Sequence, residues 1–281
     1  MAKAMSFVVV FIVVNINRRL VEQPVVNMSN LSIVHDDCVT VLENFKTQDI
    51  KFNLIYVDIP FNTGKTQSIH GKSYSDDFGD DFVDVWLVPK LELAHHVLKD
   101  DGSFFIHADS REIHYVKVAL DKIFGRSNFM NEIIWSYDYG GRSKKKWSAK
   151  HDTILWYAKN HKKYTFNYDA IDRIPYMAPK LVGPVKKAIG KTPTTVWWST
   201  IVPTMGKERV NYPTQKPMKI IERIVKVHSN KGDNLLDFFA GSGTFGEAAL
   251  KNDRNVTLVD SNLEAIEVMK KRLGKYQIDG I

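Results

Sequence analysis

The chain has 281 residues, and its 39 Lys and Arg residues exceed its 32 Asp and Glu residues, giving a formal net charge of +7 at pH 7. This length supports a sizeable hydrophobic core and excludes a disulfide-dependent mini-protein, while the basic excess is compatible with a polyanionic partner but does not require one. The only cysteine, Cys38, cannot form an internal disulfide, and no Cys/His cluster has metal-ligand spacing, so we expect a cytoplasmic protein without a structural metal.

Residues 1–27 form an N-terminal extension whose role the sequence leaves open. Its apolar run SFVVVFIVV, residues 6–14, is far shorter than the roughly 20 residues of a membrane-spanning helix. Only Lys3 precedes the run and no small-residue cleavage site follows it, which argues against an export signal. The β-branched residues favour a strand or a disordered extension, and we expect no membrane partner.

Strands and helices alternate from Leu31 onward. The apolar runs at 31–34 and 52–58 are typical of strands buried on both faces, and a helix is predicted between them at 39–48. A helix at 83–100, closed by the Asp-Gly pair that follows, a strand at 104–109 and a helix at 111–124 continue the pattern. This alternation predicts an α/β fold with a doubly wound, Rossmann-like sheet.

The middle of the chain, from residue 131 to about residue 212, has weak periodicity and a basic loop at 138–150. A run of charges is usually a solvated loop tip. Here, however, aromatic residues alternate with the charges, as a surface that neutralises phosphates and stacks on bases requires. The residues that we expect to contact nucleic acid are Arg142, Lys144, Lys145, Lys146 and Lys150, interleaved with Trp135, Tyr137, Tyr139 and Trp147.

Regular patterns return after Tyr212, with helices predicted at 217–229, 244–253 and 262–273 and strands at 234–241 and 255–260. The sequence DFFAGSGTFG, residues 237–246, places Gly241 and Gly243 where a strand turns into a helix, so the backbone can approach an anionic group. It lacks the spacing of a dinucleotide or phosphate loop, which disfavours NAD and ATP. With Asp260 ending the next strand, the pattern favours a nucleoside ligand that carries a carboxylate over a plain tight turn.

Three motifs in this order resemble the β class of S-adenosylmethionine-dependent DNA amino-methyltransferases. DIPF (58–61) resembles the catalytic DPPY/DPPF motif of that family, NYPTQKP (211–217) resembles the segment before its cofactor loop, and DFFAGSGT (237–244) resembles the loop itself. The resemblance covers roughly Leu31 to Leu273. It implies a circularly permuted methyltransferase fold with a mixed sheet over residues 28–281, into which an irregular target-recognition region is inserted at about 160–210.

The resemblance also implies a binding site for S-adenosylmethionine. The methionine carboxylate of this cofactor is expected near the helix that follows Gly243, with help from Thr214 and Lys216, and Asp260 is expected to hold the ribose. Asp37 corresponds to an acidic position near the adenine, and Cys38 to a chemically idle neighbour. The full expected set is Asp37, Cys38, Asp58, Thr214, Gln215, Lys216, Phe239, Gly241, Gly243, Thr244 and Asp260.

The catalytic residues implied by DIPF are Asp58, Ile59, Pro60 and Phe61. An exocyclic amine on a base is a poor nucleophile, and accepting hydrogen bonds from both of its hydrogens frees the nitrogen lone pair. Asp58 and the carbonyl of Ile59 are expected to be the two acceptors, and Phe61 is expected to stack on the flipped base. The family usually has proline where Ile59 stands. Because Pro60 still favours extended backbone at residue 59, we expect reduced or normal activity rather than none.

These features predict a bacterial or phage methyltransferase, associated with the nucleoid, that acts on the N6 of adenine in double-stranded DNA. Aspartate at position 58 resembles the adenine enzymes, and methylation of cytosine N4 is the nearest alternative. A catalytically silent protein that binds the cofactor and DNA, suggested by Ile59, and methylation of RNA or protein are further alternatives. The resemblance also implies a homodimer and a partner restriction endonuclease.

Overall fold

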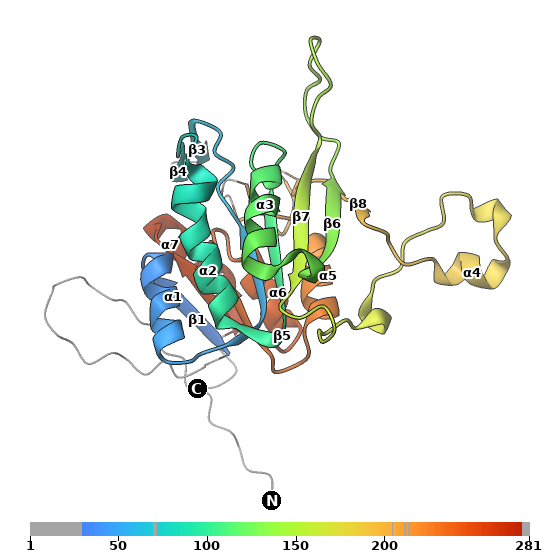
Figure 1. Cartoon of the computed structure of the whole chain (residues 1–281). Coiled ribbons are helices and arrows are strands. Elements are labelled where there is room, and N and C mark those ends of the chain that lie inside the picture. The colour runs from blue at the N-terminus through green and yellow to red at the C-terminus, as the bar shows by residue number, and fades with distance from the viewer. Residues whose placement is uncertain (1–29, 70–71, 204, 211, 213, 277–281) are drawn as a thin grey trace, which may run out of the picture.

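The computed structural model describes residues 30–69, 72–203, 205–210, 212 and 214–276, so the predicted extension at 1–27 lies outside the described residues. An eight-stranded sheet runs through the molecule in the order β1-β10-β9-β2-β5-β7-β6-β8 (Figure 1). Its first five strands are parallel to one another, β7 is antiparallel to β5 and β6, and β8 is parallel to β6. The strands are β1 (Leu31–His35), β2 (Phe52–Asp58), β5 (Leu98–Ala108), β6 (Phe129–Ser136), β7 (His151–Ala158), β8 (Val196–Trp198), β9 (Asn234–Asp237) and β10 (Asn255–Asp260).

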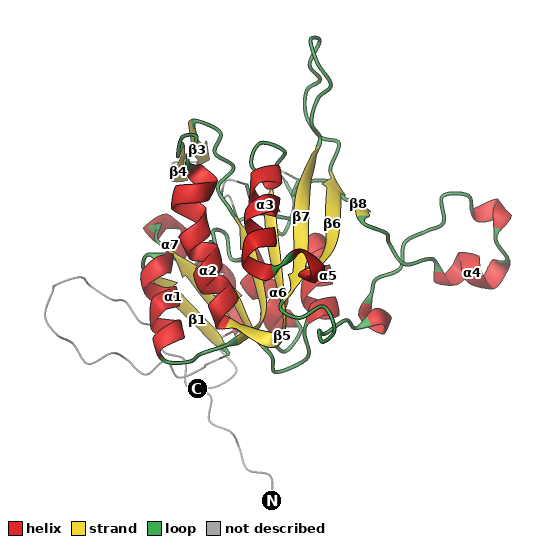
Figure 2. Cartoon of the chain, in the orientation of Figure 1, coloured by secondary structure: helices red, strands yellow, loops and turns green. Residues whose placement is uncertain are grey.

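Helices cover both faces of this sheet (Figure 2). One face carries α1 (Cys38–Thr47), the π-helical turn η1 (Phe82–Leu87), α2 (Val88–Val97) and α3 (Ile113–Phe124), and the other carries α5 (Met218–His228), α6 (Thr244–Lys251) and α7 (Leu263–Leu273). Apolar side chains at helical spacing, such as Ile221, Ile224 and Val225 of α5, belong to the core cluster that packs against the sheet and are buried. The three-layer α/β architecture and the mixed sheet predicted from the sequence are confirmed.

Two segments extend away from the sheet (Figure 1). The chain between β6 and β7 forms a long hairpin, and the chain between β7 and β8 forms a lobe that contains α4 (Pro184–Ile189). A separate antiparallel ribbon is formed by β3 (Lys65–Ile69) and β4 (Lys72–Asp76). Single-turn 3-10 helices lie at η2 (Arg126–Asn128), η3 (Tyr168–Ala170), η4 (Pro179–Leu181) and η5 (Gly274–Tyr276). None of the helices in the described part of the chain has the length and apolar character needed to cross a membrane.

Two expectations about individual elements were wrong. The helix predicted at 83–100 ends at Val97, and Leu98 already belongs to β5, because Asp100–Gly102 form an irregularity inside the strand where the pairing with β2 shifts from Phe52–Leu98 to Leu54–Ser103. The middle segment is also more regular than predicted. Its strands β6 and β7 bury Trp135 at 3 % exposure, where its indole Nε1 donates to the Ser199 carbonyl at 2.7 Å, so this ring belongs to the core.

Candidate active site

A cavity of about 410 Å³ lies where the carboxyl ends of several parallel strands meet. Asp58 ends β2, Asp237 ends β9 and Asp260 ends β10, and all three carboxyl groups line the cavity. Asp37 lines it as well and follows β1, which is the neighbour of β10. In open parallel sheets, ligands bind outside the carboxyl ends of the strands, so the topology places this cavity where a binding site is expected.

Asp58 makes one strong contact and leaves one acceptor unused. Its Oδ2 accepts a hydrogen bond from the Lys216 ammonium at 2.5 Å, and the same ammonium lies 4.8 Å from the centre of the Phe61 ring. Its Oδ1 is buried, and no hydrogen-bond partner for it lies within the described part of the chain. A buried carboxylate oxygen without a donor favours a ligand that brings an N–H group.

Ile59 is held in place by the neighbouring strand. Its N–H donates to the carbonyl of His107 on β5 at 3.2 Å, and its side chain is 2 % exposed. A proline at this position lacks the N–H and cannot make this bond. Residue 59 is therefore held by a backbone hydrogen bond and a buried side chain. In the DPPY/DPPF motif, a proline ring restricts the backbone at this position.

Replacing Ile59 by proline is expected to change the rate of methyl transfer by less than about tenfold. The ring restricts φ, but the substitution removes one backbone hydrogen bond, which contributes about 1 kcal/mol, and a buried side chain. The measurement is the single-turnover rate of both proteins with saturating DNA and cofactor. A gain above about a thousandfold, roughly 4 kcal/mol of barrier, would mean that isoleucine severely impairs the motif.

The glycine-rich turn after β9 is tied to the end of β10. Gly241 has φ +48° and its N–H donates to Asp260 Oδ2 at 2.8 Å, while Asp260 Oδ1 accepts from the Asn262 N–H at 2.8 Å. Gly243 has φ +71°, and a Cβ there would lie 2.9 Å from Cγ of Met269, so only glycine fits without a shift of that side chain. The two glycines therefore set the path of the backbone between the strand and α6.

Burial raises the pKa of Asp260, and it raises the pKa of Asp237 well above its ordinary value despite the hydrogen bond from the Phe239 N–H at 3.0 Å. The negative charge of Asp58 adds to the rise at Asp237. Asp237 was not among the predicted site residues. Because carboxyl groups converge here in a desolvated environment, the cavity favours a ligand with hydroxyl, amino or positively charged groups.

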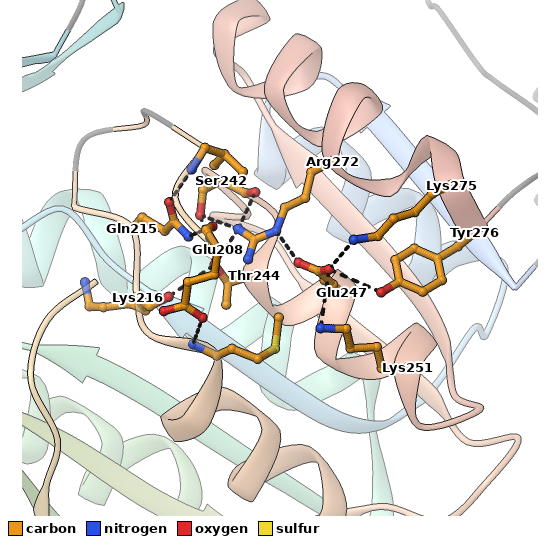
Figure 3. A network of polar contacts seen from close by, with 12 residues as sticks. Glu208, Gln215, Lys216, Ser242, Thr244, Glu247, Lys251, Arg272, Lys275 and Tyr276 are labelled. Carbon is orange, nitrogen blue, oxygen red and sulfur yellow. Dashed lines mark hydrogen bonds and ion pairs between the residues drawn. The ribbon is translucent and has the colours of Figure 1, made fainter. Parts of the chain in front are cut away.

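Arg272 of α7 forms hydrogen bonds with the glycine-rich turn (Figure 3). Its Nε pairs with Glu247 Oε2 at 2.7 Å, and its Nη1 donates to the Ser242 carbonyl at 3.1 Å and to the Thr244 hydroxyl at 2.8 Å. Lys275 also pairs with Glu247, at 2.7 Å. Although burial alone would raise it, these cations hold the pKa of Glu247 at about 2. The network fixes the first turn of α6 relative to α7.

An aromatic wall closes one side of the cavity. Trp86 of η1 stacks on Phe239, with the ring centres 5.5 Å apart, and it also packs against Phe78 and Phe82. The buried Lys90 places its Nζ 3.9 Å from the centre of the Trp86 ring and donates to the Trp86 carbonyl at 2.7 Å. Such a wall suits a flat ring, and the cation beneath it orients the indole.

Most of the predicted catalytic and cofactor residues are brought together in this cavity. Cys38 and Gly243 are not among its lining residues: Cys38 faces the core, where burial raises the pKa of its thiol to about 12, and Gly243 packs against Met269 of α7. Lys216, predicted to help hold a cofactor carboxylate, lines the cavity and pairs with Asp58. The predicted residues that do line the cavity are Asp37, Asp58, Ile59, Pro60, Phe61, Thr214, Gln215, Lys216, Phe239, Gly241, Thr244 and Asp260.

Several of these side chains have partners within the protein. The Gln215 amide bonds the backbone at Glu208 and Val210, at 2.7 and 2.9 Å, so it shapes the loop. The Thr244 hydroxyl contacts the Lys216 carbonyl at 3.3 Å as well as Arg272. Tyr56, Phe78 and Trp86 line the cavity but were missed, because only the fold brings them there. Tyr212 and Asp237 were missed as well, although they lie within the NYPTQKP and DFFAGSGT motifs.

The predicted DNA-contacting residues lie on the β6–β7 hairpin, outside the cavity (Figure 1). Arg142, Lys144, Lys145 and Lys146 are exposed and Lys150 is half-buried at its base, while Arg142 pairs with Asp138 at 2.7 Å. Trp147 is 99 % exposed, and Tyr139 is exposed too. The hairpin thus presents cations and an aromatic ring to solvent.

A family model described as DNA methylase matches residues 52–271 of the chain. The chain belongs to the DNA methylase family. The methylase is 31% identical over 255 residues to DNA adenine methyltransferase YhdJ of Escherichia coli (strain K12), covering 86% of this chain and 82% of that protein. It is 33% identical over 241 residues to the type II methyltransferase M.HpaI of Haemophilus parainfluenzae, covering 86% and 73% of the two chains.

Solved structures show that the methylase shares its fold with this group of proteins. The M1.HpyAVI-SAM complex matches with a TM-score of 0.62 at 23% identity, covering 86% of this chain and 98% of that chain. The cytosine-N4-specific PvuII DNA methyltransferase matches with a TM-score of 0.64 at 17% identity, covering 87% and 86%. These similarities place the strand-end cavity of this chain in a fold used for DNA methylation.

Proposed function

We propose that this methylase transfers a methyl group from S-adenosylmethionine to the N6 of an adenine in DNA. The observation that carries this proposal is the unpartnered Oδ1 of Asp58, which faces no donor in the described part of the chain and adjoins the glycine-rich turn in one cavity. YhdJ, at 31% identity, is named a DNA adenine methyltransferase, which supports adenine as the target base.

The polar and aromatic groups that line the cavity suit S-adenosylmethionine. Asp260 and Asp37 offer carboxylates to ribose and adenine groups, and Trp86 and Phe239 offer a flat apolar wall. At Gly241 a Cβ would lie only 3.2 Å from Cε1 of Tyr212, so the turn needs glycine to leave room beside that ring. When bound there, S-adenosylmethionine supplies a methyl group on a positively charged sulfur.

The residues of the chain prepare the acceptor. Asp58 Oδ1 accepts one hydrogen of the target amine and the Ile59 carbonyl accepts the other, which frees the nitrogen lone pair. As the nitrogen becomes positively charged, the Asp58 carboxylate stabilises that charge and is the nearest acceptor for the proton it must release. Phe61 stacks on the base after it leaves the duplex. Positioning of the amine by these groups supplies much of the rate.

The ion pair between Lys216 and Asp58 has a role in this scheme. The ammonium neutralises the carboxylate before substrate arrives and lies beside the Phe61 ring, on which the target base is expected to stack. It also offers the cation that we expect near the cofactor carboxylate. When cofactor and base bind, the Lys216 ammonium therefore either moves away from Asp58 or shares its hydrogen bonds between Asp58 and the cofactor carboxylate.

The test is incubation of the protein with unmethylated duplex DNA and isotopically labelled S-adenosylmethionine, followed by digestion to nucleosides and mass spectrometry. Label on N6-methyladenine is the expected result. Label on cytosine N4 would retain the mechanism and overturn the choice of base. Bound cofactor without any label on DNA would support the silent protein, in which Ile59 disables the motif.

DNA binding is assigned to the β6–β7 hairpin together with the lobe at 160–210, both inserted into a methyltransferase domain that spans residues 28–281. The cations of the hairpin suit the phosphates, and the fully exposed Trp147 suits stacking on a base. The lobe adds exposed Lys180, Lys186 and Lys187. Sequence recognition is therefore expected from segments that stand clear of the cavity.

Changing Lys144, Lys145 and Lys146 together to alanine is expected to weaken DNA binding and to lower the slope of log K against log salt by about 3, since each phosphate contact contributes about 0.9. The measurement is fluorescence anisotropy over a salt series. The control changes Lys46, Lys122 and Lys231, exposed cations at the amino ends of the strands, to alanine. Equal slopes for the two triple variants would remove the hairpin from the DNA interface.

We also propose that the protein works in a bacterial or phage cytoplasm, associated with the nucleoid, as a homodimer and beside a partner restriction endonuclease. M.HpaI, at 33% identity, is named a type II methyltransferase, which supports the restriction-modification setting. Sedimentation at micromolar concentration tests the dimer, and a monomer under those conditions would contradict it.

A further inference from the structure

A hydrogen-bonded chain of polar side chains runs behind the catalytic motif, from β2 through β5 and β7 to the residue that follows β6. Tyr56 of β2 bonds Nδ1 of His107 on β5 through its hydroxyl at 2.9 Å, and Nε2 of His107 lies 3.3 Å from Oδ2 of Asp152 on β7. Oδ1 of Asp152 accepts from the hydroxyl of Tyr137, just after β6, at 3.3 Å. A neutral imidazole that carries its proton on Nε2 satisfies both of its neighbours.

The centre of this chain has no contact with water. His107 is 0 % exposed, and Tyr56 and Asp152 are buried too. Although burial alone would raise the pKa of Asp152, the hydrogen bond from His107 holds it below its ordinary value. Buried polar groups destabilise a core unless every partner is present, so apolar side chains would be simpler here if the strands needed only to pack.

The hydrogen-bonded chain meets the catalytic motif at His107. The His107 carbonyl accepts the N–H of Ile59 at 3.2 Å, and His107 pairs in register with Asp58. The ring of His107 lies 6.2 Å from that of Phe61. The orientation of His107 thus bears on the carboxylate, the carbonyl acceptor and the stacking ring of the motif.

At Tyr137, the hydrogen-bonded chain reaches the base of the β6–β7 hairpin. The N–H groups of Tyr137 and Asp138 both donate to the carbonyl of Lys150, at 3.1 and 3.3 Å, which closes the hairpin where it leaves the sheet. Asp152 lies two residues beyond Lys150 on β7. A shift of the hairpin base therefore moves Tyr137 and Asp152 together.

We propose that His107 is a positioning residue for the methylation motif and that the Tyr56–His107–Asp152–Tyr137 chain couples the base of the basic hairpin to the Ile59 carbonyl. The proposal rests on the proposed function, because the motif it positions is the one that accepts the target amine. When the hairpin binds DNA, the positions of the two acceptors, Asp58 Oδ1 and the Ile59 carbonyl, then change. DNA binding is thereby coupled to the rate of methyl transfer.

The experiment compares His107→Leu with Ser103→Ala. Ser103 is also buried on β5 and accepts a hydrogen bond from the indole of Trp156 on β7 at 3.1 Å, but it does not line the cavity. Its loss therefore controls for a missing buried hydrogen bond between the same two strands. The readouts are the single-turnover rate at saturating DNA and cofactor, the two dissociation constants, and hydrogen exchange at the Ile59 amide without and with DNA.

For His107→Leu we expect a rate about 10- to 100-fold below wild type, affinities within about twofold, and Ile59 amide exchange that is faster and no longer slowed by DNA. His107→Gln, which keeps a donor and an acceptor, is expected to recover most of the rate. Ser103→Ala is expected to leave all three readouts near wild type. Parallel losses in His107→Leu and Ser103→Ala would show a merely structural role and overturn the proposal.

The proposal can still be tested if His107→Leu does not fold or if the wild-type protein is inactive. If His107→Leu does not fold, Tyr137→Phe removes a single oxygen at the far end of the chain, and the proposal requires that it abolish the slowing of Ile59 exchange by DNA. An unchanged response would overturn the coupling. If the wild-type protein transfers no methyl group at all, the proposed function fails, while the exchange measurement still tests the connection between the hairpin and Ile59.

Discussion

Asp58→Asn is expected to lower the single-turnover rate of methyl transfer by about 10²- to 10³-fold. The amide oxygen still accepts a hydrogen bond, but the negative charge that stabilises the developing cation on nitrogen is lost. The Lys216 ammonium, 2.5 Å from the carboxylate, also loses its counter-charge. Rapid-quench measurement of labelled methyl transfer checks the rate, and equilibrium dialysis with labelled S-adenosylmethionine should show an affinity within about fivefold of wild type.

The control for this variant is Asp121→Asn. Asp121 also pairs with a lysine, Lys117, at 2.7 Å, but both residues lie on α3 and neither lines the cavity. Its rate is expected to stay within about twofold of wild type. A rate for Asp58→Asn within tenfold of wild type would show that the charge of this carboxylate does not drive the reaction.

Arg272→Met is expected to lower the free energy of unfolding by about 1–3 kcal/mol, because the buried Ser242 carbonyl and Thr244 hydroxyl lose their donor, while Glu247 keeps its ion pairs with Lys251 and Lys275. The Arg272 side chain is 3 % exposed and also bonds the Ser242 carbonyl and the Thr244 hydroxyl (Figure 3). The glycine-rich turn then loses its anchor on α7. We therefore also expect cofactor affinity to fall at least tenfold in the folded protein, measured by calorimetry below the unfolding transition.

Lys275→Met separates the anchoring of the turn from the charge balance of Glu247. Lys275 pairs with Glu247 at the same distance as Arg272, 2.7 Å, but its side chain is exposed and it makes no contact with the turn. Its loss is expected to cost less than about 1 kcal/mol and to leave cofactor affinity unchanged. Equal effects of the two substitutions on affinity would mean that the turn does not depend on Arg272.

The outer parts of the fold were predictable because their signals are local. The strands at β2 and β10 are continuous apolar runs, and helices such as α5 and α7 carry apolar side chains at helical spacing. The strands β6 and β7 were not recognised, since the aromatic and basic residues around them indicated a surface. Their burial depends on pairing β7 with β5, about 45 residues earlier in the chain, and sequence periodicity does not report such pairing.

The site was predictable where a motif carries it and not where packing does. Asp58, Gly241 and Asp260 belong to recognisable strand ends, whereas Trp86 reaches the cavity from a helical turn that the pattern marks only as apolar. The ion pair between Lys216 and Asp58 spans 158 positions in sequence. His107 carries no motif of its own, and its contacts with Tyr56 and Asp152 exist only after three strands align.

Every residue that lines the cavity comes from the stretches 37–86 and 212–262, and the lobe between β7 and β8 contributes none. A recombination event with both break points inside that lobe would therefore replace it without altering a single side chain at the reaction centre. Under our proposal that the lobe contributes to recognition, such an event would change the target sequence in one step and leave the catalytic residues unchanged. The lobe can therefore vary in sequence independently of the residues that line the cavity.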